Sequence, residues 1–220
     1  MPETIELKLG NGTLSIQIPK NEIFRLDAIF KEQEYAIADP GPVHSVVDIG
    51  ANIGLTAIYF KILYPTARIC CFEPCLSSFD MLEHNIARLQ DVRAFHLALA
   101  DYDGEATLHI HKDNSGQNSL TNDGAAFTEH KKVPVKDAYS LFQKMDITTL
   151  EILKIDTEGS ELPILRSLEP MLGHVRHILV ETHGLEDRRA IEALLRHTHT
   201  LARDASHAEG FGVLQFRRKD

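Results

Sequence analysis

The stretch Val46-Val47-Asp48-Ile49-Gly50-Ala51-Asn52-Ile53-Gly54 decides the fold class of this chain. Its apolar start predicts a buried strand that ends in Asp48, and its two glycines predict a tight turn into a helix over about residues 53–64. The N–H groups at the start of such a helix can hold an anionic group such as a carboxylate. An ordinary strand-to-helix turn would explain one glycine, whereas Asp48 and Asn52 around two glycines favour a ligand site.

The same turn argues against a ligand that carries a pyrophosphate. In the dinucleotide fingerprint G-x-G-x-x-G the middle glycine lets the backbone approach the pyrophosphate, but here Asn52 stands in that position and Leu55 in the third. The charge of Asp48 would oppose a phosphate and favour an ammonium or a sulfonium. The turn therefore predicts a ligand with an amino-acid head and no phosphate, such as S-adenosylmethionine. A nicotinamide-dependent oxidoreductase is the weaker alternative.

Outward from this turn, apolar runs and amphipathic runs alternate along the chain. Strands are predicted over residues 68–72, 92–97, 150–155 and 175–180, and helices over 77–89 (capped by Ser77), 138–144, 161–168 and 186–197. Further strands are predicted at 106–110 and 132–135 around a polar loop, and at 200–203 and 211–217. This alternation is typical of a doubly wound α/β fold, whose parallel sheet binds ligands beyond the carboxyl ends of its strands.

The N-terminal part has a different pattern. Apolar residues alternate with polar ones on both sides of Asn11-Gly12, which predicts a β-hairpin from Ile5, Leu7 and Leu9 to Leu14, Ile16 and Ile18. Residues 23–30 predict a short amphipathic helix, and Pro40-Gly41-Pro42 interrupts the chain. We therefore expect a hairpin and lead-in helix over residues 1–42, packed on an S-adenosylmethionine-binding domain over residues 43–220.

Composition limits the partners that we expect. The chain has 220 residues and a net charge of -9, which suits one α/β domain and disfavours nucleic acid and anionic membrane surfaces as partners. Neither a secretory signal nor an apolar stretch long enough to span a bilayer is visible, so a cytoplasmic location is expected. Cys70, Cys71 and Cys75 are expected to be reduced thiols, with Cys70 and Cys71 on opposite faces of a strand, and no metal is assigned. The pattern does not indicate an oligomeric state.

Acidic residues follow the later strands at the same predicted edge. Glu73 can accept hydrogen bonds from a ribose diol. Asp101 can accept from an adenine amino group, or is simply a turn residue. Capping explains Glu161, but not Asp156 or Glu158, which stand beside Lys154 at the end of an apolar strand. If the 175–180 strand continues, Glu181 and His183 point the same way and can act as an acid, a base or an orienting pair.

In this order, Asp48 to Gly54, Phe72-Glu73-Pro74, Ala98 to Asp101 and Lys154 to Glu161 resemble the FkbM family of methyltransferases. The resemblance covers about residues 22–183 and implies a class I methyltransferase fold, with a seven-stranded sheet whose last strand is antiparallel. It also implies O-methylation of polyketides, sugars or other natural products. It further implies cofactor contacts from Asp48, Gly50, Asn52, Gly54, Glu73 and Asp101, from Tyr35 in the lead-in, and from Asn118-Ser119 in the middle loop.

The expected reaction is in-line displacement of the sulfonium methyl group by a hydroxyl oxygen, assisted by a base. We expect Asp156 or His183 as the base, with Lys154 or Glu158 positioning a small-molecule or glycan acceptor. One alternative adds a divalent metal, for which Asp156, Glu158 and Glu181 offer oxygen ligands. Another is a cofactor-binding module without catalysis. The acceptor itself is not encoded in any motif.

Overall fold

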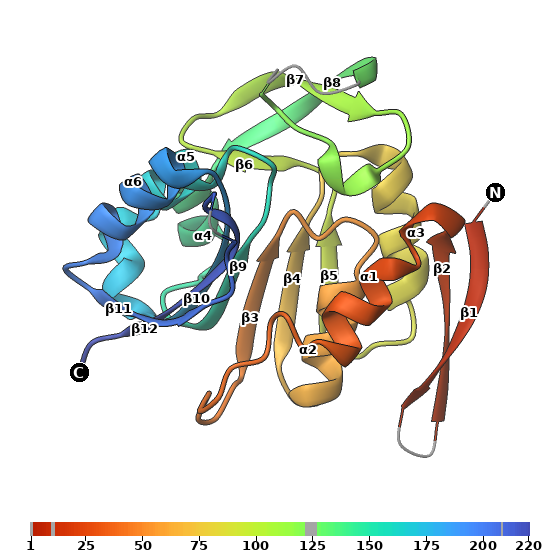
Figure 1. The fold of residues 1–220 in the computed structure, drawn as a ribbon, viewed down its shortest axis with the longest axis horizontal. Coiled ribbons are helices and arrows are strands. Elements are labelled where there is room, and N and C mark those ends of the chain that lie inside the picture. The colour runs from red at the N-terminus through yellow and green to blue at the C-terminus, as the bar shows by residue number, and fades with distance from the viewer. Residues whose placement is uncertain (1, 10–11, 122–126, 208) are drawn as a thin grey trace.

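The computed structural model describes residues 2–9, 12–121, 127–207 and 209–220, and a seven-stranded sheet forms its centre (Figure 1). The strand order is β11-β12-β10-β9-β3-β4-β5. The strands from β10 to β5 run parallel, and β12 is antiparallel to both of its neighbours. The predicted fold class, including the antiparallel last strand, is therefore confirmed. The strands are β3 (Ser45–Ile49), β4 (Arg68–Phe72), β5 (Val92–Phe95), β9 (Leu150–Ile155), β10 (Val175–His183), β11 (His199–Asp204) and β12 (Phe211–Arg218).

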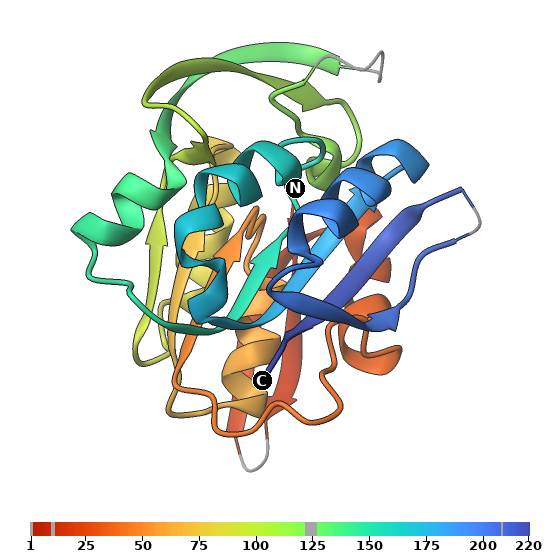
Figure 2. The ribbon, with the colours of Figure 1, turned by 90° about the vertical axis from the view of Figure 1, so that its left-hand side faces the viewer.

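Helices cover both faces of this sheet because its strands alternate apolar side chains between two cores. Val46 and Ile152 pack with α2 (Leu55–Leu63) and α3 (Leu76–Ile86). Val47 and Leu153 pack with the opposite layer, which lies toward the viewer in Figure 2. That layer consists of α4 (Ala138–Lys144), α5 (Glu161–Ser167), the 3-10 helix η4 (Glu169–His174) and α6 (Leu185–Leu195). Among the described residues, no helix is both long and apolar enough to cross a membrane.

The cysteines follow the same alternation. Cys71 belongs to the core beneath α2, and Cys70 packs against the opposite core, as the strand pattern predicts. Cys75 directly precedes α3 and is its N-cap residue, so Ser77 lies inside the helix and is not the cap that we expected. All three are free thiols.

The N-terminal hairpin consists of β1 (Pro2–Leu9) and β2 (Gly12–Pro19), paired antiparallel with Ile5 opposite Ile16. Leu14, Ile16 and Ile18 are buried in the α2–α3 core. Asn11 of the predicted turn lies outside the described residues, and Gly12 begins β2. The single lead-in helix that we predicted is instead three short turns: η1 (Lys20–Glu22), α1 (Phe24–Leu26) and the π-helix η2 (Asp27–Lys31).

A second sheet lies beyond the carboxyl ends of β3, β4 and β5, across the top of Figure 1. The third predicted strand ends early, at Phe95, and the chain then forms β6 (Ala98–Ala100), which pairs with β8 (Phe127–Asp137). β8 pairs in turn with β7 (Gly104–His111). The strands that we expected around the polar loop therefore form a separate sheet, order β6-β8-β7, above the ligand edge of the main sheet.

Candidate active site

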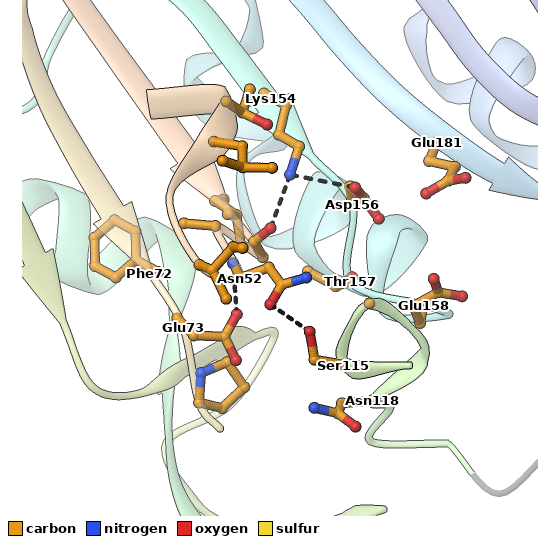
Figure 3. Close-up of a pocket in the computed structure, with 18 of the residues that line it drawn as sticks. Asn52, Phe72, Glu73, Ser115, Asn118, Lys154, Asp156, Thr157, Glu158 and Glu181 are labelled. Carbon is orange, nitrogen blue, oxygen red and sulfur yellow. Dashed lines mark hydrogen bonds and ion pairs between the residues drawn. The ribbon is translucent and has the colours of Figure 1, made fainter. Parts of the chain in front are cut away.

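A cavity of about 270 Å³ lies at the carboxyl ends of β3, β4, β9 and β10. Between β3 and β9 the order of connection reverses, and doubly wound sheets bind their ligands at such a point. Two other segments complete the walls: residues 24–35, and the loop around the short 3-10 helix η3 (Ser115–Gln117). Figure 3 shows Asn52 and Glu73 on one side of this cavity, and Asp156, Glu158 and Glu181 on the other.

The two glycines of the β3–α2 turn are required by contacts within the protein. A Cβ atom on Gly50 would lie 1.7 Å from the carbonyl oxygen of Asp156, and Gly50 has a φ of +76°. A Cβ atom on Gly54 would lie 2.6 Å from Leu82 Cδ1 in α3. Gly50 lines the cavity, whereas Gly54 does not. Gly54 therefore allows the turn to pack against α3, and it does not border the cavity where we expected it to contact the cofactor.

The N–H groups of this turn are already bonded within the protein. Gly50 and Ala51 donate to the Phe72 carbonyl at 3.0 and 3.1 Å, and the Asn52 N–H donates to Glu73 Oε2 at 2.9 Å. Glu73 is thus the anion that the Asn52 N–H holds in the turn before the helix. The helix itself begins at Leu55, and an anionic ligand group at its first N–H groups stays a prediction.

Glu73 faces the cavity from the end of β4. Its other oxygen, Oε1, accepts from the Cys75 N–H at 2.8 Å. Burial raises the pKa of Glu73 to about 7, although the two backbone hydrogen bonds and Lys154 oppose the rise. A carboxylate oxygen has more than one acceptor position, so Glu73 can pin the turn and still accept from a ligand.

Asp48 and Lys154 are opposite each other in the parallel register of β3 and β9. Lys154 Nζ lies 3.0 Å from Asp48 Oδ1 and 3.3 Å from Asp156 Oδ2, and donates to the Gly50 carbonyl at 2.8 Å. These contacts use the three donors of an ammonium group. Burial lowers the pKa of Lys154, but Asp156 and Asp48 outweigh it and hold the pKa above its usual value.

Two expectations change with this ion pair. Asp48 is fully buried and does not line the cavity, so its charge is balanced by Lys154 and is not free for a ligand cation. Lys154, only 2% exposed, serves as a counterion inside the protein and has no donor left to position an acceptor. The sequence shows both residues but not that their strands are neighbours.

Asp156 and Glu181 lie together on the acidic side of the cavity. Burial would raise the pKa of Asp156, but Lys154 and a hydrogen bond with Glu181 hold it below the usual range. Burial, the charge of Asp156 and the shared hydrogen bond raise the pKa of Glu181 well above its usual value. The pKa values of the two carboxyl groups are therefore driven apart, that of Asp156 downward and that of Glu181 upward. Tyr35, which lines the cavity as expected, donates its hydroxyl to Asp156 Oδ2 at 3.3 Å.

Glu181 is the cavity residue whose importance the sequence least reveals. It precedes His183 by two positions on a strand that does continue, and this spacing was the available signal. Glu181 lines the cavity but His183 does not.

Glu158 sits on a turn whose backbone is fixed from several sides. It has a φ of +57°, which is uncommon for a residue other than glycine. Its carbonyl accepts from the Ser119 hydroxyl. The buried Glu161 accepts from the N–H groups of Thr157 at 2.7 Å and Gly159 at 2.9 Å. The Glu158 side chain lines the cavity, where burial and Asp156 raise its pKa to about 7 despite the opposing effect of His183.

His183 lies behind Glu158. Burial alone would lower its pKa, but Glu161, Glu158 and Asp156 outweigh burial and raise it to about 9. Nδ1 is 3.6 Å from Glu158 Oε2, and Nε2 is 3.5 Å from Glu161 Oε1. A pKa of about 9 favours the protonated imidazole at neutral pH, and a protonated ring cannot accept a further proton, which argues against the expected role of His183 as the base.

The middle loop meets the first turn across the cavity. The Ser115 hydroxyl donates to Asn52 Oδ1 at 2.8 Å, and Asn118 lines the cavity while its Oδ1 accepts from the His111 N–H at 2.9 Å. Ser119, expected beside the cofactor, instead anchors the Glu158 turn and does not line the cavity. Residues 122–126 of this loop lie outside the described residues.

Asp101 is not brought to the cavity. β6 leaves the main sheet to pair with β8, so it carries Asp101 into an exposed turn after Ala100. The cavity wall in this region is formed instead by the apolar residues Leu97, Ala98 and Leu99. The expected contact of Asp101 with adenine is therefore corrected.

A doubly wound seven-stranded sheet with one antiparallel strand and a carboxylate-lined cavity at its switch point defines a class I methyltransferase fold. More particularly, the chain belongs to the family described as the Methyltransferase FkbM domain, which matches residues 48–211. The protein is thus an enzyme that uses S-adenosylmethionine as its methyl donor. The oxidoreductase and the non-catalytic module are set aside.

Known relatives agree with this family. Methyltransferase sdnD of Sordaria araneosa is 28% identical over 87% of this chain and 88% of its own length. The 31-O-demethyl-FK506 methyltransferase FkbM of Streptomyces tacrolimicus is 24% identical over 89% of both chains. The solved methyltransferase FkbM of Methylobacillus flagellatus KT matches 90% of this chain with a TM-score of 0.59 at 12% identity, and this chain spans 48% of that one.

The residues present at the cavity fit S-adenosylmethionine. Glu73 offers carboxylate acceptor positions for a ribose diol, and Phe72 and Leu97 offer an apolar wall for a base. In the ion-paired group of Asp48, Lys154 and Asp156, two carboxylates face one ammonium, so the group keeps a net negative charge next to the cavity. This charge suits a sulfonium and an ammonium better than a phosphate.

Proposed function

We propose that the chain transfers a methyl group to a hydroxyl oxygen of a small molecule, sugar or other natural product. The bound cofactor supplies a sulfonium methyl group that a nucleophile displaces in line. The observation that carries the proposal is Glu158, a cavity carboxylate with a pKa of about 7 on a fixed turn. A relative of comparable length is named for methylation at oxygen 31 of FK506, which supports oxygen as the acceptor atom.

For the cofactor we propose contacts from residues of the first two turns and from the cover of the cavity. Glu73 accepts from the ribose, and Gly50 and Asn52 border the methionine part. Asn118 contributes an amide from the middle loop, and Tyr35 covers the cofactor while it holds Asp156 in place. Phe72, Leu97 and Leu99 form the apolar wall for adenine.

For the base we propose Glu158. An acceptor hydroxyl is a weak nucleophile, and a base is most effective when its pKa lies near the working pH. Asp156 is too weak a base because Lys154 holds its pKa low, and His183 is already protonated. Glu158 combines a pKa of about 7 with a position on the cavity wall, and Glu73, which shares both properties, is tied to the N–H groups of Asn52 and Cys75.

A metal-assisted reaction is the second candidate, because oxygen atoms of Asp156, Glu158 and Glu181 lie within 4.8 Å of one another. The protein's own groups already compensate part of this charge. Lys154 faces Asp156 as well as Asp48, His183 lies 3.6 Å from Glu158, and Glu181 forms a hydrogen bond with Asp156. We therefore favour transfer without a metal. Loss of turnover after exhaustive chelation, restored by Mg²⁺, would reverse this preference.

The proposed function is tested by a methyl-transfer screen. S-adenosylmethionine labelled in its methyl group is incubated with the protein and a panel of monosaccharides, uronic acids, hydroxylated macrolides and phenols. The expected product is an alkali-stable methyl ether. Label found only in alkali-labile esters or in N-methyl groups would contradict a hydroxyl acceptor.

A further inference from the structure

We propose that Arg25 binds the carboxylate of S-adenosylmethionine and so lets the protein distinguish this cofactor from a sulfonium nucleoside that lacks the carboxylate. Arg25 belongs to α1, and its side chain lines the cavity. The inference concerns the cofactor alone. It therefore depends neither on a hydroxyl acceptor nor on Glu158 as the base, and it can be tested without any acceptor.

The charges along the cavity wall leave few places for an anionic group. S-adenosylmethionine carries a carboxylate in addition to its ammonium and its sulfonium. The cavity is lined by several carboxyl groups, those of Glu34, Glu73, Asp156, Glu158 and Glu181. Among the described residues that line it, Arg25 and Lys154 are the only ones with cationic side chains. Because like charges repel, we expect the ligand carboxylate to bind beside one of these two cations.

Lys154 has no donor left for this carboxylate. Its Nζ lies 3.0 Å from Asp48 Oδ1 and 3.3 Å from Asp156 Oδ2, and it donates to the Gly50 carbonyl at 2.8 Å. An ammonium group has three donors, and these three contacts use all of them. Arg25 is therefore the cation that remains for a ligand carboxylate.

The guanidinium group of Arg25 has donors to spare. It carries five N–H donors, and among the described residues it makes one hydrogen bond, from Nη2 to Asn114 Oδ1 at 2.7 Å. Nε is buried without a hydrogen-bond partner in the same part of the chain, although Glu22 Oε2 lies 3.4 Å away. Glu22 faces Ser115 instead: Oε1 accepts from the Ser115 N–H, and Oε2 lies 2.8 Å from the Ser115 hydroxyl. A carboxylate can accept two parallel hydrogen bonds from a guanidinium with free donors.

The middle loop fixes the place of this guanidinium. A Cβ atom on Gly116 would lie 1.8 Å from Arg25 Nη2, so a larger residue there would displace the group. The hydroxyl of the neighbouring Ser115 lies 2.8 Å from Asn52 Oδ1, a contact drawn as a dashed line in Figure 3. Asn52 borders the methionine part in the proposed cofactor contacts. Arg25 is thus held close to the part of the cavity where the carboxylate of the cofactor is expected.

The test compares two ligands that differ only in the carboxylate, S-adenosylmethionine and decarboxylated S-adenosylmethionine. Neither reacts without an acceptor, so calorimetry gives both Kd values directly. The unaltered protein should bind S-adenosylmethionine more tightly than the decarboxylated compound. In Arg25→Met the Kd for S-adenosylmethionine should rise about 10- to 150-fold, because a hydrogen-bonded ion pair is lost. The decarboxylated compound has no anionic group and should not bind more weakly to this variant.

Two outcomes would overturn the proposal. Equal weakening of both ligands in Arg25→Met would show that Arg25 only holds the cover of the cavity in place. Unchanged binding of S-adenosylmethionine would show that the carboxylate is held elsewhere, and the first N–H groups of α2 would then be the expected site. Arg189→Met, which alters an exposed arginine of α6, is the matched control and should leave both Kd values unchanged.

A conservative variant keeps the test decisive if Arg25→Met does not fold, as judged by circular dichroism. Arg25→Lys keeps the positive charge but loses the planar fork of paired donors. The preference for S-adenosylmethionine over the decarboxylated compound should therefore be smaller than in the unaltered protein. An undiminished preference in Arg25→Lys would contradict binding of the carboxylate by the guanidinium.

Discussion

The turns after β3 and after β9 are built with the same device but end in different chemistry. In each turn a buried carboxylate accepts two backbone N–H groups: Glu73 from Asn52 and Cys75 near the first turn, and Glu161 from Thr157 and Gly159 in the second. Glu73 also faces the cavity, whereas Glu161 is turned away from it. In the second turn, Glu161 therefore holds the backbone in place while a different residue, Glu158, presents its carboxylate at the cavity wall.

This difference shows that the position of an acidic residue after a strand does not by itself indicate its role. A carboxylate that both pins a turn and faces a ligand is tied to backbone donors, which favours binding over proton transfer. Burial raises the pKa of both Glu73 and Glu158 to about 7, so the difference between them is the pair of backbone N–H groups, from Asn52 and Cys75, that Glu73 accepts from. The first turn should thus govern cofactor affinity and the second should govern turnover.

The largest expected effect comes from Glu158→Gln. The amide cannot take a proton, so turnover should fall by about 10²–10⁴-fold, the usual contribution of a general base. S-adenosylmethionine affinity should stay within about threefold of the unaltered protein, because Glu158 is not needed to hold the cofactor. Single-turnover methyl transfer and calorimetry measure the two quantities separately. A loss of affinity equal to the loss of turnover would erase the proposed division between the turns.

The second largest effect is expected at Lys154, which contacts Asp48 before the first turn and Asp156 before the second. Lys154→Met leaves Asp48 and Asp156 buried without their cation, and breaking a buried pair in this way costs about 3–5 kcal/mol of unfolding free energy. Denaturant unfolding at pH 7 measures the loss. The exposed Lys112→Met variant is the matched control and should change stability by less than about 0.5 kcal/mol. Equal stability of the two variants would show that Lys154 is not the counterion.

The first turn is probed by Glu73→Gln. The amide keeps one acceptor but presents N–H groups where a backbone donor already points. It also loses the charge of the carboxylate, so the proposed hydrogen bonds from the ribose lose about 1.5–3 kcal/mol. The Kd for S-adenosylmethionine should therefore rise about 10- to 150-fold, with turnover at saturation changed far less. Calorimetry on the folded variant, checked by circular dichroism, gives the result. Reduced turnover with normal affinity would reverse the roles of the two turns.

The smallest effect comes from the cover of the cavity. Arg203 in β11 donates to the carbonyls of Gln33, Glu34 and Ala36, at 3.1, 3.2 and 3.4 Å, and so holds the bend that presents Tyr35. All three bonds come from Nη1, and a lysine side chain ends one atom short of this nitrogen, so Arg203→Lys should weaken an exposed network that contributes about 0.5–1.5 kcal/mol. The KM for S-adenosylmethionine should rise about two- to tenfold in steady-state assays. The exposed Arg189→Lys variant is the control, and identical KM values would show that Arg203 does not support the bend.

Much of the fold was predictable because its signals are local. The alternation of apolar strands with amphipathic helices, and the turn after Asp48, indicated the sheet and its ligand edge. The second sheet was not predictable, because a three-residue strand such as Ala98–Ala100 has too little pattern to show that the chain leaves the main sheet. The error at Asp101 follows directly from that.

The site residues divide in the same way. The place of Glu73 and Asp156 beside the cavity was predictable from their positions at strand ends, which the chain order alone specifies. The pairing of Asp48 with Lys154 requires that β3 and β9 are neighbours in the sheet, although the two strands lie more than a hundred residues apart in sequence. The protonation of His183 depends on Glu161 being buried against it, and the helix-capping pattern that explained Glu161 concealed this second contact.

The most direct test of the account is the pH dependence of turnover at saturating S-adenosylmethionine, in the unaltered protein and in Glu158→Gln. A base acts in its deprotonated form, so turnover should rise about tenfold per pH unit up to a midpoint near 7 and then level off. The low residual rate of Glu158→Gln should show no limb near 7. The same limb in both proteins would contradict the assignment of Glu158 as the base, and with it the division of labour between the two turns.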